Sequence, residues 1–122
     1  MKVCITASGA ELGSQVDPRF GRCQTFVIFD LESGAIEAVS NPNIETSGGA
    51  GIQSAQLVAS KGVTAVITGH VGPNAFGVLN AAGVEIFIGS AGTVKDAAEA
   101  YRSGKLQRAQ AEDARSKPVP GR

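Results

Sequence analysis

Hydrophobic residues occur along the chain in short runs, separated by glycine, proline and small polar residues. Five runs are rich in β-branched and aromatic side chains, and their length and flanking turn residues are typical of strands rather than helices. We therefore predict strands over residues 2–7, 25–31, 35–40, 63–68 and 84–88. The third run carries a glutamate, Glu37, which favours a position at the edge of a sheet.

Apolar residues at helical spacing predict three helices between and after the later strands. The first covers residues 52–61. The second covers residues 73–83, where a proline suits the first helical turn and a glycine ends the pattern. Thr93 and Asp96 have the spacing of a capping box in front of a third helix, over about 94–102.

The order of these elements predicts an α/β domain with a ribonuclease-H-like arrangement. Strands reached through a helix should lie parallel to a neighbour by right-handed crossovers, whereas the first three strands follow one another as a meander. The natural solution is a mixed five-stranded sheet in the order 3-2-1-4-5, with strand 2 antiparallel and three main helices on its faces. We expect this domain to span residues 1–106 and a flexible tail to follow over 107–122.

This topology places four loops at one edge of the sheet. Strands 1, 3, 4 and 5 run in one direction, so the loops that leave their C-terminal ends share that edge. They cover residues 8–23, 41–51, 69–73 and 89–93, and they contain most of the clustered glycines. Three of them lead into helix N-termini, whose free N–H groups favour anions.

Arg19 and Arg22 lie in the longest of these loops. Together with the helix N-termini, they predict a pocket for a compact anion near the junction of strands 1 and 4. Glycine at strand–helix junctions is also ordinary turn chemistry, so a purely structural role for these loops stays open at this stage.

The charge balance narrows the range of ligands. Eleven Lys and Arg residues match eleven Asp and Glu residues, so no net field attracts nucleic acid or an anionic membrane. No apolar run approaches the ~18 residues of a membrane span, and the N-terminus lacks the features of a signal peptide. We therefore expect a cytoplasmic protein that binds neither nucleic acid nor membranes.

The predicted edge holds Glu11, Asp17 and Glu45 only in loops, which argues against metal-dependent nuclease chemistry.

The two cysteines and the single histidine are the residues with the richest chemistry. Antiparallel pairing of the first two strands puts Cys23 near Ala7, on the order of 10 Å from Cys4 at ~3.3 Å per residue, so we expect no disulfide. We interpret Cys4 as a buried core thiol. Cys23 and His70 are candidate metal ligands, or a candidate nucleophile and base, but they are too few for a closed zinc site.

Several motifs, taken in order, resemble the nitrogenase iron–molybdenum cofactor-binding family. They are DPRFGRC (17–23), SGGAG (47–51), GHVGPNA (69–75) and the capped third helix that ends in AYRSG (100–104). The resemblance covers residues 1 to about 106. The chain is most similar to the stand-alone type within this family, which carries a molybdenum–copper sulfide cluster without covalent attachment.

The resemblance implies a ribonuclease-H-like fold and a carrier that binds an anionic, molybdenum-containing metal–sulfur cluster without being an enzyme. The cluster would be of Mo–Cu–S type, with an Fe–Mo–S type as the alternative. Its partners would be proteins that donate or accept the cluster, and the carrier would be a monomer or a weak oligomer. The predicted binding residues are Arg19, Gly21, Arg22, Cys23, Ser47, Gly48, Gly49, Gly51, His70, Val71, Gly72, Pro73 and Asn74.

Two other functions stay open beside the carrier. The same pocket would suit a phosphate- or partner-binding module that uses no metal. A thiol-dependent enzyme would use Cys23, with His70 as its base.

Overall fold

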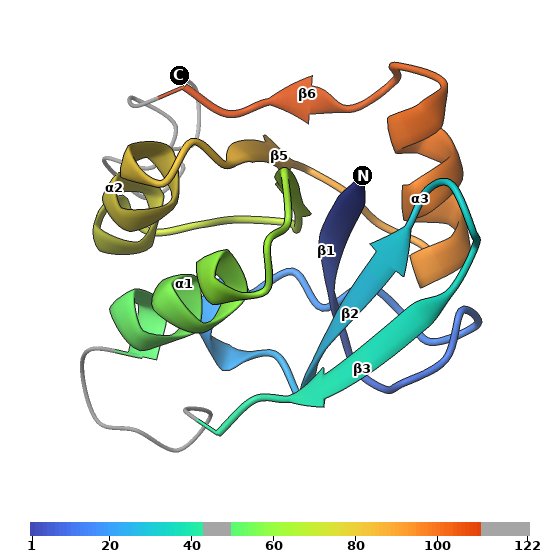
Figure 1. Cartoon of the computed structure of the whole chain (residues 1–122), viewed down its shortest axis with the longest axis horizontal. Helices are drawn as coiled ribbons and strands as arrows, with labels where there is room; N and C mark the ends of the chain where they lie inside the picture. Colours follow the sequence, from blue (N-terminus) through green and yellow to red (C-terminus); the bar gives the residue numbers. More distant parts are fainter. Residues whose placement is uncertain (43–49, 111–122) are drawn as a thin grey trace, which may run out of the picture.

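The computed structural model describes residues 1–42 and 50–110 (Figure 1). The strands are β1 (Lys2–Ala7), β2 (Thr25–Asp30), β3 (Ile36–Ser40), β4 (Ala65–Ile67), β5 (Glu85–Ile88) and β6 (Gln107–Arg108). The helices are α1 (Ala50–Ser60), α2 (Pro73–Ala81) and α3 (Val94–Arg102), and a short 3-10 turn, η1, covers Phe20–Arg22.

The sheet has the order β3-β2-β1-β4-β5-β6, which confirms the predicted order 3-2-1-4-5 and adds a sixth strand. β2 is antiparallel to β1 and β3, whereas β4 runs parallel to both β1 and β5. The register pairs Ala7 with Thr25, so the start of β2 lies beside the end of β1, as expected. The ribonuclease-H-like arrangement of the α/β domain is thereby confirmed.

The sequence does not predict β6, because two exposed polar residues carry no hydrophobic alternation. Gln107 and Arg108 pair antiparallel with β5, and the next residue, Ala109, is buried in the core. The segment that we expected to be a flexible tail, 107–122, therefore begins with a paired strand. Its remainder from residue 111 lies outside the described residues.

Helices cover both faces of the sheet, α1 and α2 on one face and α3 on the other (Figure 1). Successive residues of β2 alternate between the two faces: Phe26 and Ile28 belong to the core under α1 and α2, and Val27 and Phe29 to the core under α3. Burial on both sides explains why the central strands are continuous apolar runs rather than alternating ones. No helix among the described residues is long and apolar enough to cross a membrane.

The loop between β1 and β2 folds back over the C-terminal end of β1. In its middle, the backbone N–H of Asp17 donates to Thr6 O at 2.9 Å, and the Thr6 hydroxyl donates to Asp17 O at 2.7 Å. The Thr68 hydroxyl lies 2.8 Å from that of Thr6 and donates to it, because a hydroxyl carries a single proton. Both threonines are fully buried, so water does not compete for these hydrogen bonds.

Two neighbouring connections hold the same loop on either side. On the β4 side, His70 N donates to Pro18 O at 2.8 Å, and Phe20 N donates to His70 O at 3.3 Å. On the β5 side, Val16 N donates to Gly92 O at 2.8 Å. The loop is therefore attached to the end of β1, to the β4–α2 connection and to the β5–α3 connection.

Gly69 allows the β1–β2 loop to approach the β4–α2 connection closely. A Cβ atom at Gly69 would lie 2.6 Å from Pro18 Cα and 2.9 Å from Pro18 O, closer than Cβ atoms come to other heavy atoms in proteins. We expect Gly69→Ala to push the two segments apart and to lower the free energy of unfolding by about 1–3 kcal/mol, measured by urea denaturation.

Gly77→Ala is the matched control, because Gly77 lies within α2 and an added Cβ would have nothing within 4 Å. Replacing this helical glycine should raise the free energy of unfolding by about 0.5–1 kcal/mol. A Gly69→Ala variant as stable as the native chain would contradict the close approach.

Candidate functional site

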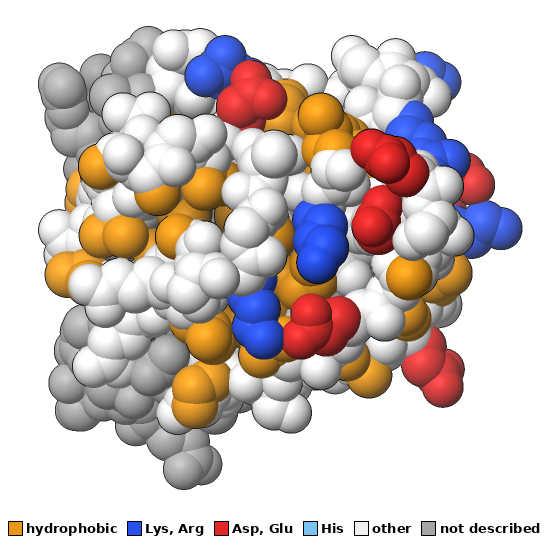
Figure 2. Space-filling view, in the orientation of Figure 1, with side chains coloured by type: hydrophobic (Ala, Val, Ile, Leu, Met, Phe, Trp, Pro, Cys, Tyr) orange, Lys and Arg blue, Asp and Glu red, His pale blue; other side chains and the backbone are white. Residues whose placement is uncertain are grey.

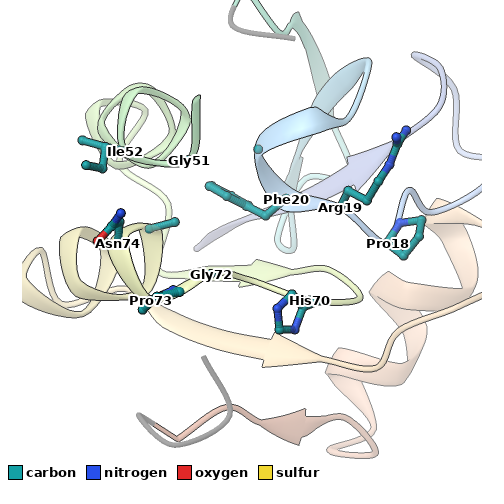
Figure 3. Close-up of a pocket in the computed structure, with 11 residues that line it drawn as sticks. Pro18, Arg19, Phe20, Gly51, Ile52, His70, Gly72, Pro73 and Asn74 are labelled. Carbon is teal, nitrogen blue, oxygen red and sulfur yellow. The ribbon is translucent and has the colours of Figure 1, made fainter. Parts of the chain in front are cut away.

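A cleft of about 310 Å³ opens at the C-terminal edge of the sheet, between η1, the first turn of α1 and the first turn of α2 (Figure 3). Most of its walls are small or apolar side chains. The lining residues are Pro18, Arg19, Phe20, Gly21, Gly51, Ile52, His70, Gly72, Pro73, Asn74 and Ala75.

The structure brings together many of the predicted binding residues in this cleft. Those in its lining are Arg19, Gly21, Gly51, His70, Gly72, Pro73 and Asn74. Cys23 and Val71 are buried in the core and Arg22 is exposed, and all three are absent from the lining. Ser47, Gly48 and Gly49 lie outside the described residues.

The prediction of binding residues omitted the apolar part of the lining, which is Pro18, Phe20, Ile52 and Ala75. Pro18, Phe20 and Ala75 fall inside the motifs DPRFGRC and GHVGPNA, so the resemblance carried a signal for them. The Phe20 side chain is 2% exposed, and its ring centroid lies 5.8 Å from that of Phe26 in the core. The apolar wall is thus continuous with the packing under α1 and α2.

The N-terminus of α2 reaches the cleft without a side-chain cap. Its N-cap residue is Gly72, and its first turn holds no acidic residue. Pro73 has no N–H, and in the described part of the chain the N–H groups of Asn74 and Ala75 have no hydrogen-bond partner. Free N–H groups at the positive end of a helix dipole favour a negatively charged ligand at this wall.

At the N-terminus of α3, which lies at the same edge of the sheet, the backbone N–H groups already have hydrogen-bond partners. Thr93 and Asp96 form the predicted capping box, with Asp96 N donating to Thr93 Oγ1 at 3.1 Å. Val94 N and Lys95 N donate to carbonyl oxygens of the β1–β2 loop, each at 2.9 Å. The loop over 89–93 therefore leads to a helix end that has no N–H group left for a ligand, in contrast to α2.

Arg19 lines the cleft, but its guanidinium is paired with Asp17. Nε lies 3.2 Å from Asp17 Oδ1, and Nη2 lies 3.2 Å from Oδ2. Figure 3 shows the Arg19 side chain directed away from Phe20 and from the first turn of α2. The positive charge that the sequence predicted for the pocket is therefore balanced by a neighbouring carboxylate.

Cys23 lies beneath the cleft rather than in it. Its thiol is fully buried and donates to Phe20 O at 3.4 Å. Burial, and then the negative charge of Asp17, raise the pKa of Cys23 to about 12. Burial also raises the pKa of Cys4 well above its ordinary value, and both cysteines are free thiols. A protonated, buried thiol is a poor nucleophile and a poor metal ligand, so the geometry does not support a Cys23-dependent enzyme.

His70 belongs to the cleft lining, and its backbone holds the β1–β2 loop (Figure 3). Among the described residues, no group of three or more His, Cys, Asp or Glu side chains could hold a metal ion. A metal centre held by these residues alone would have to bring most of its own ligands, with His70 as the one imidazole within reach.

The surface beside the cleft is poor in charge. Helices α1 and α2 contain no Lys, Arg, Asp or Glu residue. Figure 2 shows the charged side chains gathered toward β3, α3 and β6, whereas the surface over α1 and α2 is mainly apolar and uncharged. A ligand that approaches along these helices meets weak electrostatic steering.

The whole domain is similar to proteins of known sequence and structure. The family described as dinitrogenase iron-molybdenum cofactor matches residues 1–104. An uncharacterised protein of Methanocaldococcus jannaschii is 31% identical over 98 residues, which are 78% of this chain and 83% of that protein. The apo form of the orange protein from Desulfovibrio gigas has a TM-score of 0.86 and 39% identity, over 88% of this chain and 92% of that one. A NifB-like Thermotoga protein has a TM-score of 0.78 and 41% identity, over 88% and 91% of the two chains.

The burial of both thiols can be tested by alkylation. The thiolate is the reactive species, and the pKa of Cys23 lies at about 12, so a folded protein at about pH 8 should keep both cysteines unmodified by iodoacetamide. Raising the pH to about 9 should change little, because it stays well below the folded pKa. In about 6 M urea the thiols regain a pKa of ~8.5, and both should react within minutes.

Mass spectrometry counts the labels on each cysteine. Cys23 labelling in the folded protein at a rate close to that in urea would contradict its burial.

Proposed function

Because the chain belongs to the dinitrogenase iron-molybdenum cofactor family, we propose that it is a carrier of an anionic, molybdenum-containing metal–sulfur cluster. The cluster binds non-covalently in the cleft between η1, α1 and α2 and is then passed to a partner protein. The observation that carries this proposal is the N-terminus of α2 in the cleft wall, where the N–H groups of Asn74 and Ala75 have no partner among residues 1–42 and 50–110.

The free N–H groups of α2 support an anionic ligand in particular. A neutral acceptor can take the hydrogen bonds, but an anion in addition gains a charge–dipole attraction from the positive end of the helix. At about 310 Å³ the cleft is near the lower end of small-molecule pockets, so a compact ligand is favoured.

The apolar wall supports a sulfide-rich ligand over a phosphate. A phosphate loses strong hydration on entering a site lined by Phe20, Ile52 and Pro73, and the Arg19 charge that would compensate is already paired. Sulfide ligands are larger, softer and more weakly hydrated, so apolar contacts cost them less. The Mo–Cu–S type follows from the resemblance to the stand-alone members of the family, with an Fe–Mo–S cluster as the alternative.

The state of the side chains supports a carrier rather than an enzyme. The Cys23 thiol is buried and protonated, so it cannot pair with His70 as an activated nucleophile. No metal-chelating cluster is present among the described residues, which fits a cluster that arrives with its own sulfide ligands and leaves intact. The proteins that donate and accept the cluster would act in the cytoplasm, where thiols stay reduced.

Cluster uptake by the purified protein is the direct test. Addition of tetrathiomolybdate with copper(I) should produce charge-transfer absorption in the visible range, and molybdenum and copper should co-elute with the protein on gel filtration. Absence of both signals would reject the carrier. In that case a rise of the melting temperature with inorganic phosphate would favour the phosphate-binding module, since a ligand that binds only the folded state stabilises it.

Asn74→Asp tests the role of the α2 N-terminus. An acidic residue in the first turn should raise the free energy of unfolding by about 0.3–1 kcal/mol. The same negative charge lies in the cleft wall, so it should weaken cluster binding by roughly three- to tenfold. Opposite effects on stability and binding are hard to explain by damage to the fold.

Asn80→Asp is the matched control, because it makes the same change at the exposed C-terminal end of α2. Six residues separate the two positions, or ~9 Å along a helix, so binding should change less than about twofold. Equal binding by the Asn74→Asp and native proteins would contradict the proposed position of the anion. Both variants are measured by titration of the visible absorption.

A further inference from the structure

Asp17 is a carboxylate next in sequence to the cleft lining: it is absent from the lining itself, but the two residues after it, Pro18 and Arg19, belong to it. It is 7% exposed, and its backbone is fixed by hydrogen bonds of 2.9 Å and 2.7 Å to Thr6. The residue therefore cannot move out into solvent while the β1–β2 loop keeps its place. A fixed negative charge repels an anion in the cleft unless a cation lies close to it.

Arg19 provides that cation. Its guanidinium makes two contacts of 3.2 Å with the Asp17 carboxylate, although 66% of the side chain stays exposed and the residue lines the cleft. It is the one Lys or Arg in the described lining. Two-point pairing with a carboxylate holds a guanidinium in one orientation, and here that orientation points away from the α2 N-terminus (Figure 3).

The negative charge of Asp17 is not needed for the shape of the loop. Asp17 Oδ1 also accepts the backbone N–H of Arg19 at 2.9 Å, which is a local turn contact. The amide oxygen of an asparagine accepts the same hydrogen bond and favours the same kind of turn. The shape of the loop and the charge of the carboxylate can therefore be separated by experiment.

We infer that Asp17 limits the affinity of the cleft for its anionic ligand by holding the Arg19 guanidinium in an ion pair. The inference rests on the proposed carrier function. A bound anion competes with Asp17 for the guanidinium, so only part of the Arg19 charge acts on the ligand. A carrier has to release what it binds, and the ion pair keeps the complex weak enough for release.

Asp17→Asn is the decisive variant, since it removes the charge and keeps the turn contact. We expect it to bind the tetrathiomolybdate–copper(I) cluster roughly three- to tenfold more tightly than the native protein, because one unit of opposing charge is gone and Arg19 is released. Glu85→Gln is the matched control: it releases Arg108 from a 3.3 Å ion pair at the β5–β6 edge and should leave affinity unchanged.

The same substitution in an Arg19→Gln background separates the two contributions. If Asp17 acts by withholding the guanidinium, the gain from Asp17→Asn should fall to about twofold or less when Arg19 is absent. An equal gain in both backgrounds would overturn the inference, because the carboxylate would then act only through its own charge. Unchanged or weaker binding by a folded Asp17→Asn protein would overturn it as well.

Arg19→Lys gives a second, independent route that does not alter Asp17. Lysine keeps the charge but cannot form the two-point pair, so this variant should bind the cluster at least as tightly as the native protein. Weaker binding by Arg19→Lys would overturn the inference.

Thermal unfolding of each variant shows that it is folded. If the native protein itself takes up no cluster, the carrier proposal fails and this inference with it, whereas native uptake without a gain in Asp17→Asn rejects the inference alone.

Discussion

The hydrogen bond from the buried Thr6 hydroxyl to the Asp17 carbonyl oxygen holds the β1–β2 loop on the end of β1, and the site depends on it. With that point fixed, the loop runs along the β4–α2 connection and turns into η1, where it provides one wall of the cleft. The other walls are the first turns of α1 and α2, which pack on the same face of the sheet. The cleft is therefore a product of strand order and of the contacts that fix this loop, rather than of any single motif.

The same loop also decides which helix end can accept a ligand. Its carbonyl oxygens occupy the first N–H groups of α3, and Thr93 with Asp96 completes the cap there. The first turn of α2 receives no such partner from the described residues, and it lies in the wall of a cleft with mostly small or apolar side chains. Two helices that look equivalent in topology thus differ at their N-termini: the first N–H groups of α3 have hydrogen-bond partners, whereas those of Asn74 and Ala75 in α2 have none among the described residues.

Most of the fold could be predicted from the sequence, because strands buried on both faces are unbroken apolar runs and the Thr93–Asp96 spacing marks a helix start. β6 could not, since Gln107 and Arg108 owe their pairing to the neighbouring strand and not to their own pattern. The glycine-rich loops pointed to the edge of the sheet at which the structure has the cleft. The pairing of Arg19 with Asp17 and the burial of Cys23 depend on side-chain directions that are set only when the loop is in place. Likewise, the sequence does not distinguish Gly69 from other turn glycines. Only the structure shows that Pro18 leaves no room for a Cβ atom at this position.

The burial of both thiols has a consequence for the chemistry of the proposed cargo. Thiolates are strong ligands of soft metals, so a reactive cysteine in the wall would become a covalent ligand of a metal–sulfur cluster that has to be displaced on release. Cys23 is absent from the described cleft lining. Its buried thiol donates to the Phe20 carbonyl oxygen and keeps its proton at physiological pH. Under the proposed function, the described part of the cleft wall therefore offers the cluster no thiolate that must later be displaced.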